Sequence, residues 1–129
     1  MTRLLIQGGR VLDPSTSLDE VADVLIEDGA IAAVGAGLDA TGAERLDAEG
    51  CWVAPGFVDL HTHLREPGQE YKEDIASGGR SAAAGGFTAI ACMANTDPVN
   101  DDPSVTEYIL ARARTDSPVR VYPVAAATR

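Results

Sequence analysis

The spacing of turn residues changes at Pro55-Gly56, and this change limits the fold more than any other feature of the sequence. Before it, short apolar segments alternate with turn pairs such as Gly8-Gly9 and Asp28-Gly29. After it, the apolar segments are separated by stretches long enough for the crossovers that parallel strands require. We therefore predict two domains, residues 1–54 and residues 55–129.

Residues 1–54 have the pattern of a small antiparallel β module. Asp28-Gly29 separates two apolar segments at the two-residue spacing that favours a β-hairpin. Short strands punctuated by turns continue on both sides of this hairpin. The predicted strands cover residues 4–7, 11–12, 24–27, 30–34 and 51–54.

Residues 55–129 are predicted to alternate strand, helix, strand, helix, strand. Asp102 and Pro103 are residues typical of a helix cap and of a first helical position. The order begins either a doubly wound sheet or a (β/α)₈ barrel, and a whole barrel needs about 250 residues. The 129 residues are too few to close one. The predicted strands are 57–64, 87–93 and 119–125, and the predicted helices are 74–84 and 103–114.

The composition argues against several classes of protein. A formal charge of −10 argues against a nucleic-acid surface, which needs clustered Lys and Arg. No apolar run is long enough to cross a bilayer, and the N-terminus lacks a signal-peptide pattern, so we expect no membrane partner. Cys51 and Cys92 lie in apolar segments and are predicted to be buried, reduced thiols, which fits a cytoplasmic location. No phosphate-binding loop and no nucleophilic serine motif is present.

The most informative segment is residues 57–68, FVDLHTHLREPG. Side chains alternate along a strand, so Asp59, His61 and His63 are predicted to share one face, about 7 Å separating the two histidines. Two imidazoles so placed can bind one Zn²⁺ at about 2.0–2.1 Å. The alternative is that the two histidines are partly exposed polar residues on an edge strand. The Pro-Gly pair before this strand and the charged loop after it favour a metal site instead. The opposite face, predicted to be covered by helices, would hold Val58, Leu60, Thr62 and Leu64.

Arg65 and Asn95 are candidate substrate-binding residues. The guanidinium of Arg65 can bind a carboxylate through two parallel hydrogen bonds, or it can pair with Glu66 or Glu70 on a solvated loop. Asn95 ends the second predicted strand and would project from the same rim as His63 and Arg65. Its amide can donate to a carboxylate and accept from a ring N–H, but residue types alone favour an Asx turn over residues 95–98.

These residues resemble a known family. Residues 55–63, PGFVDLHTH, are similar to the first-strand signature of the amidohydrolase superfamily. The continuation LREPG at 64–68, then EYKEDI at 70–75, resembles more specifically the dihydroorotases of the long, bacterial type. Residues 92–98, CMANTDP, resemble their second-strand motif, with Ala94 where the family usually has proline. The likeness covers essentially the whole chain.

The resemblance implies an α/β fold: the start of a (β/α)₈ TIM-type amidohydrolase barrel, preceded by part of a small β-sandwich domain. It implies zinc binding by His61 and His63, with one or two zinc ions in each full-length subunit. It also implies that Arg65 and Asn95, beside His63, hold the substrate. The catalytic base, a bridging carboxylate and two further histidines would all lie beyond residue 129, so no catalytic residue is expected within this chain, which we interpret as an inactive fragment.

The activity implied is zinc-dependent, reversible cyclisation of N-carbamoyl-L-aspartate to dihydroorotate, a step of pyrimidine biosynthesis. Small-molecule substrates are expected, together with a homodimer or an association with aspartate transcarbamoylase. One alternative is another cyclic amidohydrolase, such as a hydantoinase or an allantoinase. A second is a non-catalytic dihydroorotase-like subunit that supports aspartate transcarbamoylase.

Overall fold

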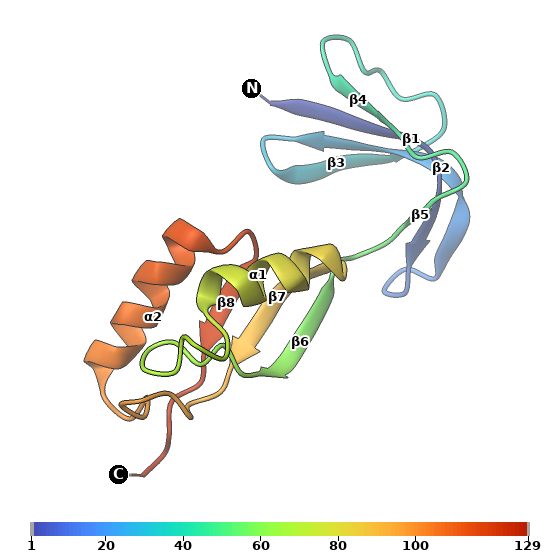
Figure 1. Ribbon diagram of the computed structural model, residues 1–129. Coiled ribbons are helices and arrows are strands. Elements are labelled where there is room, and N and C mark those ends of the chain that lie inside the picture. Colours follow the sequence, from blue (N-terminus) through green and yellow to red (C-terminus); the bar gives the residue numbers. More distant parts are fainter. Residues whose placement is uncertain (1, 129) are drawn as a thin grey trace. The chain divides into compact units, whose positions relative to one another are not determined.

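The computed structural model describes residues 2–128 and divides into two compact units, Met1–Pro55 and Gly56–Arg129 (Figure 1). No helix in the described part of the chain is both long enough and apolar enough to cross a membrane.

The first unit contains one five-stranded sheet (Figure 1). The strands follow the order β3-β2-β1-β4, and β5 also pairs with β1. β1, β2 and β3 are antiparallel neighbours, whereas β4 and β5 run parallel to β1. The sheet is therefore mixed, and the prediction of an antiparallel module was wrong for these two strands. The strands are β1 (Arg3–Asp13), β2 (Leu18–Glu27), β3 (Ala30–Gly35), β4 (Glu44–Asp47) and β5 (Trp52–Val53).

Of the two glycine-containing pairs that predict turns in this unit, one forms a turn and the other lies within a strand. Asp28 and Gly29 both have positive φ, 49° and 83°, as a type I′ turn requires, and the predicted hairpin between β2 and β3 is confirmed. Gly8-Gly9 does not end a strand. β1 continues through it with a shift of register against β2, and Gly8 takes a φ of 74°. A β-bulge at glycine accommodates the extra residue, so one long strand replaces the two short ones predicted.

The second unit is a three-stranded parallel sheet with two helices (Figure 1). The strands lie in sequence order, β6-β7-β8, and each is followed or preceded by a helical crossover, which confirms the predicted alternation. Such an order begins either a barrel or one half of a doubly wound sheet. Its elements are β6 (Phe57–Thr62), α1 (Ile75–Ala84), β7 (Phe87–Cys92), α2 (Pro103–Asp116) and β8 (Arg120–Pro123).

Both helices begin at residues that satisfy their first N–H groups. The Asp74 carboxylate accepts a hydrogen bond from the Ser77 backbone N–H, and the Ser77 hydroxyl faces the Asp74 N–H in return, which forms a capping box. Asp102 accepts from the Ser104 N–H, and Pro103 occupies the first turn of α2, as predicted.

The core of the second unit lies on one face of the sheet. Ile90, Cys92 and Val121 on that face pack against both helices, which contribute Ile75 and Ile109, the latter two at most 1% exposed. The opposite face of the sheet has no helix over it in the described residues.

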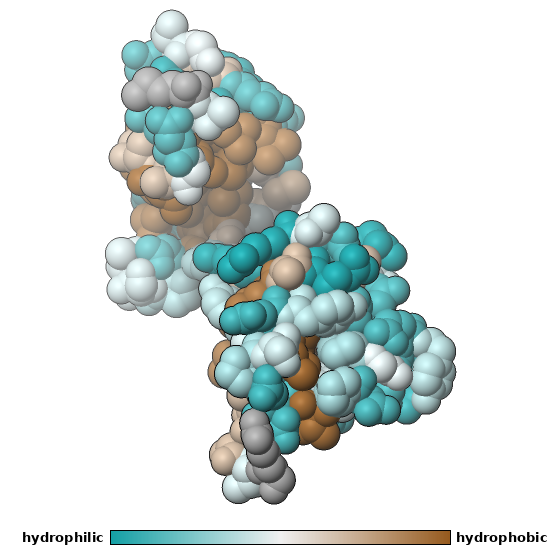
Figure 2. All heavy atoms as spheres, turned by 90° about the vertical axis from the view of Figure 1, so that its left-hand side faces the viewer, coloured by the Kyte–Doolittle hydropathy of each residue, from teal (hydrophilic) through white to brown (hydrophobic). Residues whose placement is uncertain are grey.

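The prediction that helices cover Val58 and Leu60 was wrong. These side chains are 57% and 77% exposed, and Tyr122 of β8 is 54% exposed. β6 is an edge strand, and the helices pack on β7 and β8, so apolar side chains of β6 reach the surface. Apolar residues also lie at the surface of the first unit (Figure 2). Val21 and Ile31 are 70% and 69% exposed there.

The two cysteines differ in their surroundings. Cys92 is buried, and this burial raises the pKa of its thiol, as an inert core cysteine would show. Cys51 is exposed, contrary to prediction. The predicted strand 51–54 is limited to the two residues of β5, so Cys51 lies in the turn before it. There the Cys51 N–H donates a hydrogen bond to Ala48 O.

Candidate metal and substrate site

The two histidines lie side by side at the carboxyl end of β6. Their ring centroids are 5.2 Å apart in an edge-to-face arrangement, and both side chains are exposed. The structure thus brings His61 and His63 close together at the end of a parallel strand.

Strict alternation along β6 does not hold, and this corrects the predicted position of Asp59. Asp59 is in register with Ile90, and Thr62 is in register with Cys92, both of which belong to the core beneath the helices. Side chains in register lie on one face of a sheet, so Asp59 lies on the helix face. The register shifts between Asp59 and Thr62, where Asp59 Oδ1 accepts a hydrogen bond from the His61 backbone N–H.

Asn95 is the partner of His63. Its Oδ1 lies 2.9 Å from the His63 Nδ1. An amide oxygen can only accept, so the Nδ1 carries a proton, and in the neutral ring the Nε2 then keeps its lone pair. A histidine oriented through one nitrogen in this way presents the other one to a metal ion.

The donor set fits part of a zinc site. Two imidazoles are ordinary zinc ligands, but catalytic zinc sites use about three protein ligands and structural sites about four. Within residues 2–128, no cluster of three or more His, Cys, Asp or Glu side chains could hold a metal ion. The described residues therefore supply two nitrogen ligands, His61 and His63, and no complete coordination sphere.

Arg65 and Asn95 each lie at the apex of a tight turn just after a strand. The Glu66 N–H donates to Leu64 O at 2.8 Å, and the Thr96 N–H donates to Ala94 O at 2.9 Å. Both are three-residue γ-turns, which neither a strand nor a helix pattern predicts. Arg65 has a φ of 63°, which corresponds to the rarer form of this turn. Its side chain is half-buried and forms no ion pair with the described residues, including the predicted partners Glu66 and Glu70.

The loops that carry these two residues are in direct contact. The Asp97 N–H donates to Pro67 O at 2.9 Å. Gly68 has a φ of 96°, and a Cβ atom there would lie 1.9 Å from Asp97 O. Only glycine permits both the conformation and the close approach. The second loop is further fixed by Asn100, 1% exposed, whose N–H donates to Ala94 O.

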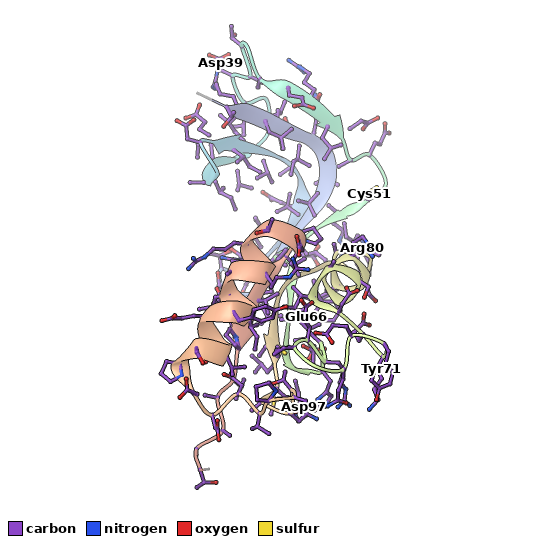
Figure 3. All side chains as sticks on the ribbon, turned by 60° about the vertical axis from the view of Figure 1, so that its left-hand side comes forward. Asp39, Cys51, Glu66, Tyr71, Arg80 and Asp97 are labelled. Atoms are coloured by element: carbon purple, nitrogen blue, oxygen red, sulfur yellow. The ribbon has the colours of Figure 1, made fainter. Side chains whose placement is uncertain are left out.

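Glu66 is the site residue whose position the sequence did not indicate. It is 3% exposed and lies between α1 and α2, whereas Tyr71 extends outward from the same loop (Figure 3). Its carboxylate accepts hydrogen bonds from Ile75 N, Tyr108 Oη and Arg112 Nε at 2.9–3.0 Å. The sequence did contain one indication of a buried acceptor: the donors Tyr108 and Arg112 are one helical turn apart on α2 and therefore lie on the same face. Their partner lies more than forty positions earlier in the chain, and no local pattern connects them.

The sequence of this chain resembles dihydroorotases along nearly its whole length. The family model described as Dihydro-orotase-like matches residues 50–128. Dihydroorotases of Geobacter metallireducens and Syntrophotalea carbinolica are 57% and 58% identical to this chain over 127 residues. These alignments cover 98% of this chain and 30% of each relative.

Solved structures share the fold of this chain at lower sequence identity. A crystal structure of D-hydantoinase superposes with a TM-score of 0.79 at 32% identity, covering 95% of this chain and 26% of that one. Dihydropyrimidinase from Brevibacillus agri NCHU1002 superposes with a TM-score of 0.80 at 30% identity, covering 96% of this chain and 27% of that one.

Together these likenesses favour the start of a barrel over a doubly wound sheet, because the chain superposes on D-hydantoinase and on dihydropyrimidinase along about a quarter of each of their chains. The chain belongs to the dihydro-orotase-like family. It spans about 30% of the length of the curated relatives it matches.

Proposed function

We propose that the whole protein is a dihydroorotase, which interconverts N-carbamoyl-L-aspartate and dihydroorotate in pyrimidine biosynthesis. The observation that carries the proposal is the identity of 57–58% to dihydroorotases across nearly the whole chain. Matching chemistry comes from the pairing of His63 with Asn95 and from the guanidinium of Arg65, which forms no ion pair within residues 2–128.

In this proposal His61 and His63 bind zinc, one or two ions per subunit, and residues outside this chain complete the coordination. Zinc held there would lower the pKa of a water molecule and polarise the amide carbonyl of the substrate ring. The hydrogen bond to Asn95 fixes the tautomer of His63, so that its Nε2 can serve as the ligand.

Arg65 and Asn95 are proposed to bind the substrate carboxylate. The guanidinium can form two parallel hydrogen bonds with it, and the Asn95 amide NH₂ is a donor, because its oxygen already accepts from His63. Both groups project from turns at the carboxyl ends of adjacent strands, the side on which barrel enzymes build their active sites. They would hold the substrate ring in a fixed orientation relative to His61 and His63.

The proposal assigns no general base to this chain. Proton transfer would depend on a carboxylate outside it, and the 129-residue polypeptide alone is expected to show no turnover. Assembly of the full-length protein as a cytoplasmic homodimer, or with aspartate transcarbamoylase, belongs to the same proposal.

The test is zinc content and dihydroorotate hydrolysis, measured in parallel on the full-length protein and on residues 1–129. We expect stoichiometric zinc and activity only in the full-length protein, and loss of both in His61→Ala. A hydantoin substrate distinguishes a dihydroorotase from a hydantoinase. A protein that opens a hydantoin ring but not the dihydroorotate ring would be a hydantoinase. A full-length protein with neither metal nor activity would instead indicate a non-catalytic subunit.

A further inference from the structure

The backbone at Arg65 adopts a conformation that it would not keep by itself. A positive φ costs a residue with a Cβ atom roughly 1–2 kcal/mol, and such residues persist where their surroundings hold them. At Arg65 the φ is 63°, and the neighbours on both sides are buried. Leu64 is 3% exposed and packs in the core, and Glu66 is 3% exposed and hydrogen-bonded.

The Glu66 carboxylate connects the Arg65 turn to two helices. Its Oε2 accepts from the Ile75 N–H, the first residue of α1, at 2.9 Å. Its Oε1 accepts from Tyr108 Oη and Arg112 Nε of α2, both at 3.0 Å. Arg112 is held in turn by Asp116, 2.8 Å from its Nη2.

Charge and hydrogen bonding both favour this arrangement. A buried carboxylate is stable where it is paired with a cation and its oxygens accept hydrogen bonds. The hydrogen bond to Glu66 raises the pKa of Arg112, while burial and Glu66 raise that of Tyr108, and both shifts favour the protonated, donating form of each group. The N–H at the start of α1 adds the positive end of the helix dipole.

We propose that Glu66 is a positioning residue for substrate carboxylate recognition: anchored to α1 and α2, it sets the turn from which Arg65 reaches the substrate. The inference rests on the proposed dihydroorotase function and deepens it. Glu66 touches neither substrate nor metal in this scheme. It acts through Arg65, and Leu64 holds the other side of the same turn.

The direct test is a double-mutant cycle in the zinc-loaded full-length enzyme, with steady-state hydrolysis of dihydroorotate as the assay. Glu66→Gln keeps the shape and one acceptor oxygen but removes the charge that pairs with Arg112. We expect KM to rise about tenfold with kcat changed by less than about threefold, as loss of uniform substrate binding predicts. Zinc content is expected to stay the same.

The cycle separates positioning from a general structural role. If Glu66 acts through Arg65, Glu66→Gln added to Arg65→Ala has no further effect on kcat/KM. If the two effects multiply, or if kcat and zinc content fall together, Glu66 stabilises the fold at large and the inference is overturned.

Two further variants complete the design. Tyr108→Phe removes one donor to Glu66 without charge change and should raise KM by a smaller factor, which keeps the test informative if Glu66→Gln fails to fold. Glu107→Gln, the same substitution at an exposed neighbouring position of α2, is the matched control and should leave both constants unchanged. A wild-type enzyme without dihydroorotate activity contradicts the proposed function. An active wild type with unchanged KM in Glu66→Gln contradicts only the role of Glu66.

Discussion

The Nδ1 of His63 and the Oδ1 of Asn95 lie 2.9 Å apart, although 32 positions separate the two residues in the sequence. The contact joins the ends of two adjacent parallel strands, β6 and β7. Because the amide oxygen accepts the Nδ1 proton, Asn95 both orients His63 and turns its own NH₂ group away from it. One amide can therefore serve a metal ligand and a substrate at once.

This dual role predicts opposite responses to two substitutions of Asn95. Asn95→Leu keeps the volume but removes the acceptor, so zinc affinity should fall about 10–100-fold, as loss of a partner that orients a ligand histidine usually causes. Asn95→Asp keeps an acceptor oxygen and should retain zinc, but its charge would repel a substrate carboxylate and raise KM. Competition with a chelator measures the first effect and steady-state kinetics the second. Equal zinc affinity in Asn95→Leu and the wild type would contradict the orienting role.

Gly68 should be far less tolerant of alanine than other glycines with positive φ. Gly68→Ala would place a Cβ atom against Asp97 O and separate the two loops, at a cost of about 1–3 kcal/mol from overpacking beyond the conformational strain. Gly42 has a φ of 75°, and a Cβ atom added there would meet nothing within 4 Å, so Gly42→Ala is the matched control for strain alone. Denaturant midpoints of the two variants provide the measurement. The expectation fails if they are displaced equally from wild type.

The stability of the second unit should depend on pH through Asp74. Hydrogen bonds from the backbone N–H and then the side chain of Ser77 hold the Asp74 pKa below its ordinary value of 3.8. A lowered pKa in the folded state contributes stability that is complete above the ordinary value and is lost as pH falls through the folded one. Asp74→Asn should thus be less stable than wild type at about pH 6, and the difference should shrink toward about pH 3. Urea unfolding at several pH values tests this, and a constant difference would contradict it.

The exposed side chains of β6 predict the behaviour of the isolated 129-residue polypeptide. With Val58 and Leu60 more than half exposed on an edge strand, we expect it to self-associate and to bind an apolar dye. Replacing both residues with serine should reduce association. Val99→Ser, at a 47% exposed position outside the sheets, should not. Light scattering after size-exclusion chromatography gives the mass, and a monomer in the unaltered polypeptide would refute the expectation.

The elements of the second unit could be predicted because their signals are local. Asp102 and Pro103 mark a helix start because a segment of helix-forming residues follows them directly, and an apolar segment such as Phe87–Cys92 forms a buried strand. The hairpin at Asp28-Gly29 follows equally from two residues. In contrast, the parallel pairing of β4 with β1 joins residues about forty positions apart, and no periodicity encodes it.

The sequence was sufficient to select the residues of the candidate site, but it was not sufficient to predict their arrangement. Residue types and the family resemblance selected His61, His63, Arg65 and Asn95. The shift of register between Asp59 and Thr62 moved Asp59 to the other face, because alternation assumes a regular strand. By its residue type and its place in a loop, Glu66 is expected to be solvated. It is buried only because α2 packs over it and donates hydrogen bonds to its carboxylate.

The close contact between Gly68 and Asp97 has a consequence for how this protein can diverge. A change in the length or sequence of the Gly68 loop would displace the Asp97 loop, and the reverse also holds, because the two loops pack directly against each other. Homologues are therefore expected to inherit the two loops together, as one module. An engineer who wishes to graft a new substrate preference here would have to transplant both.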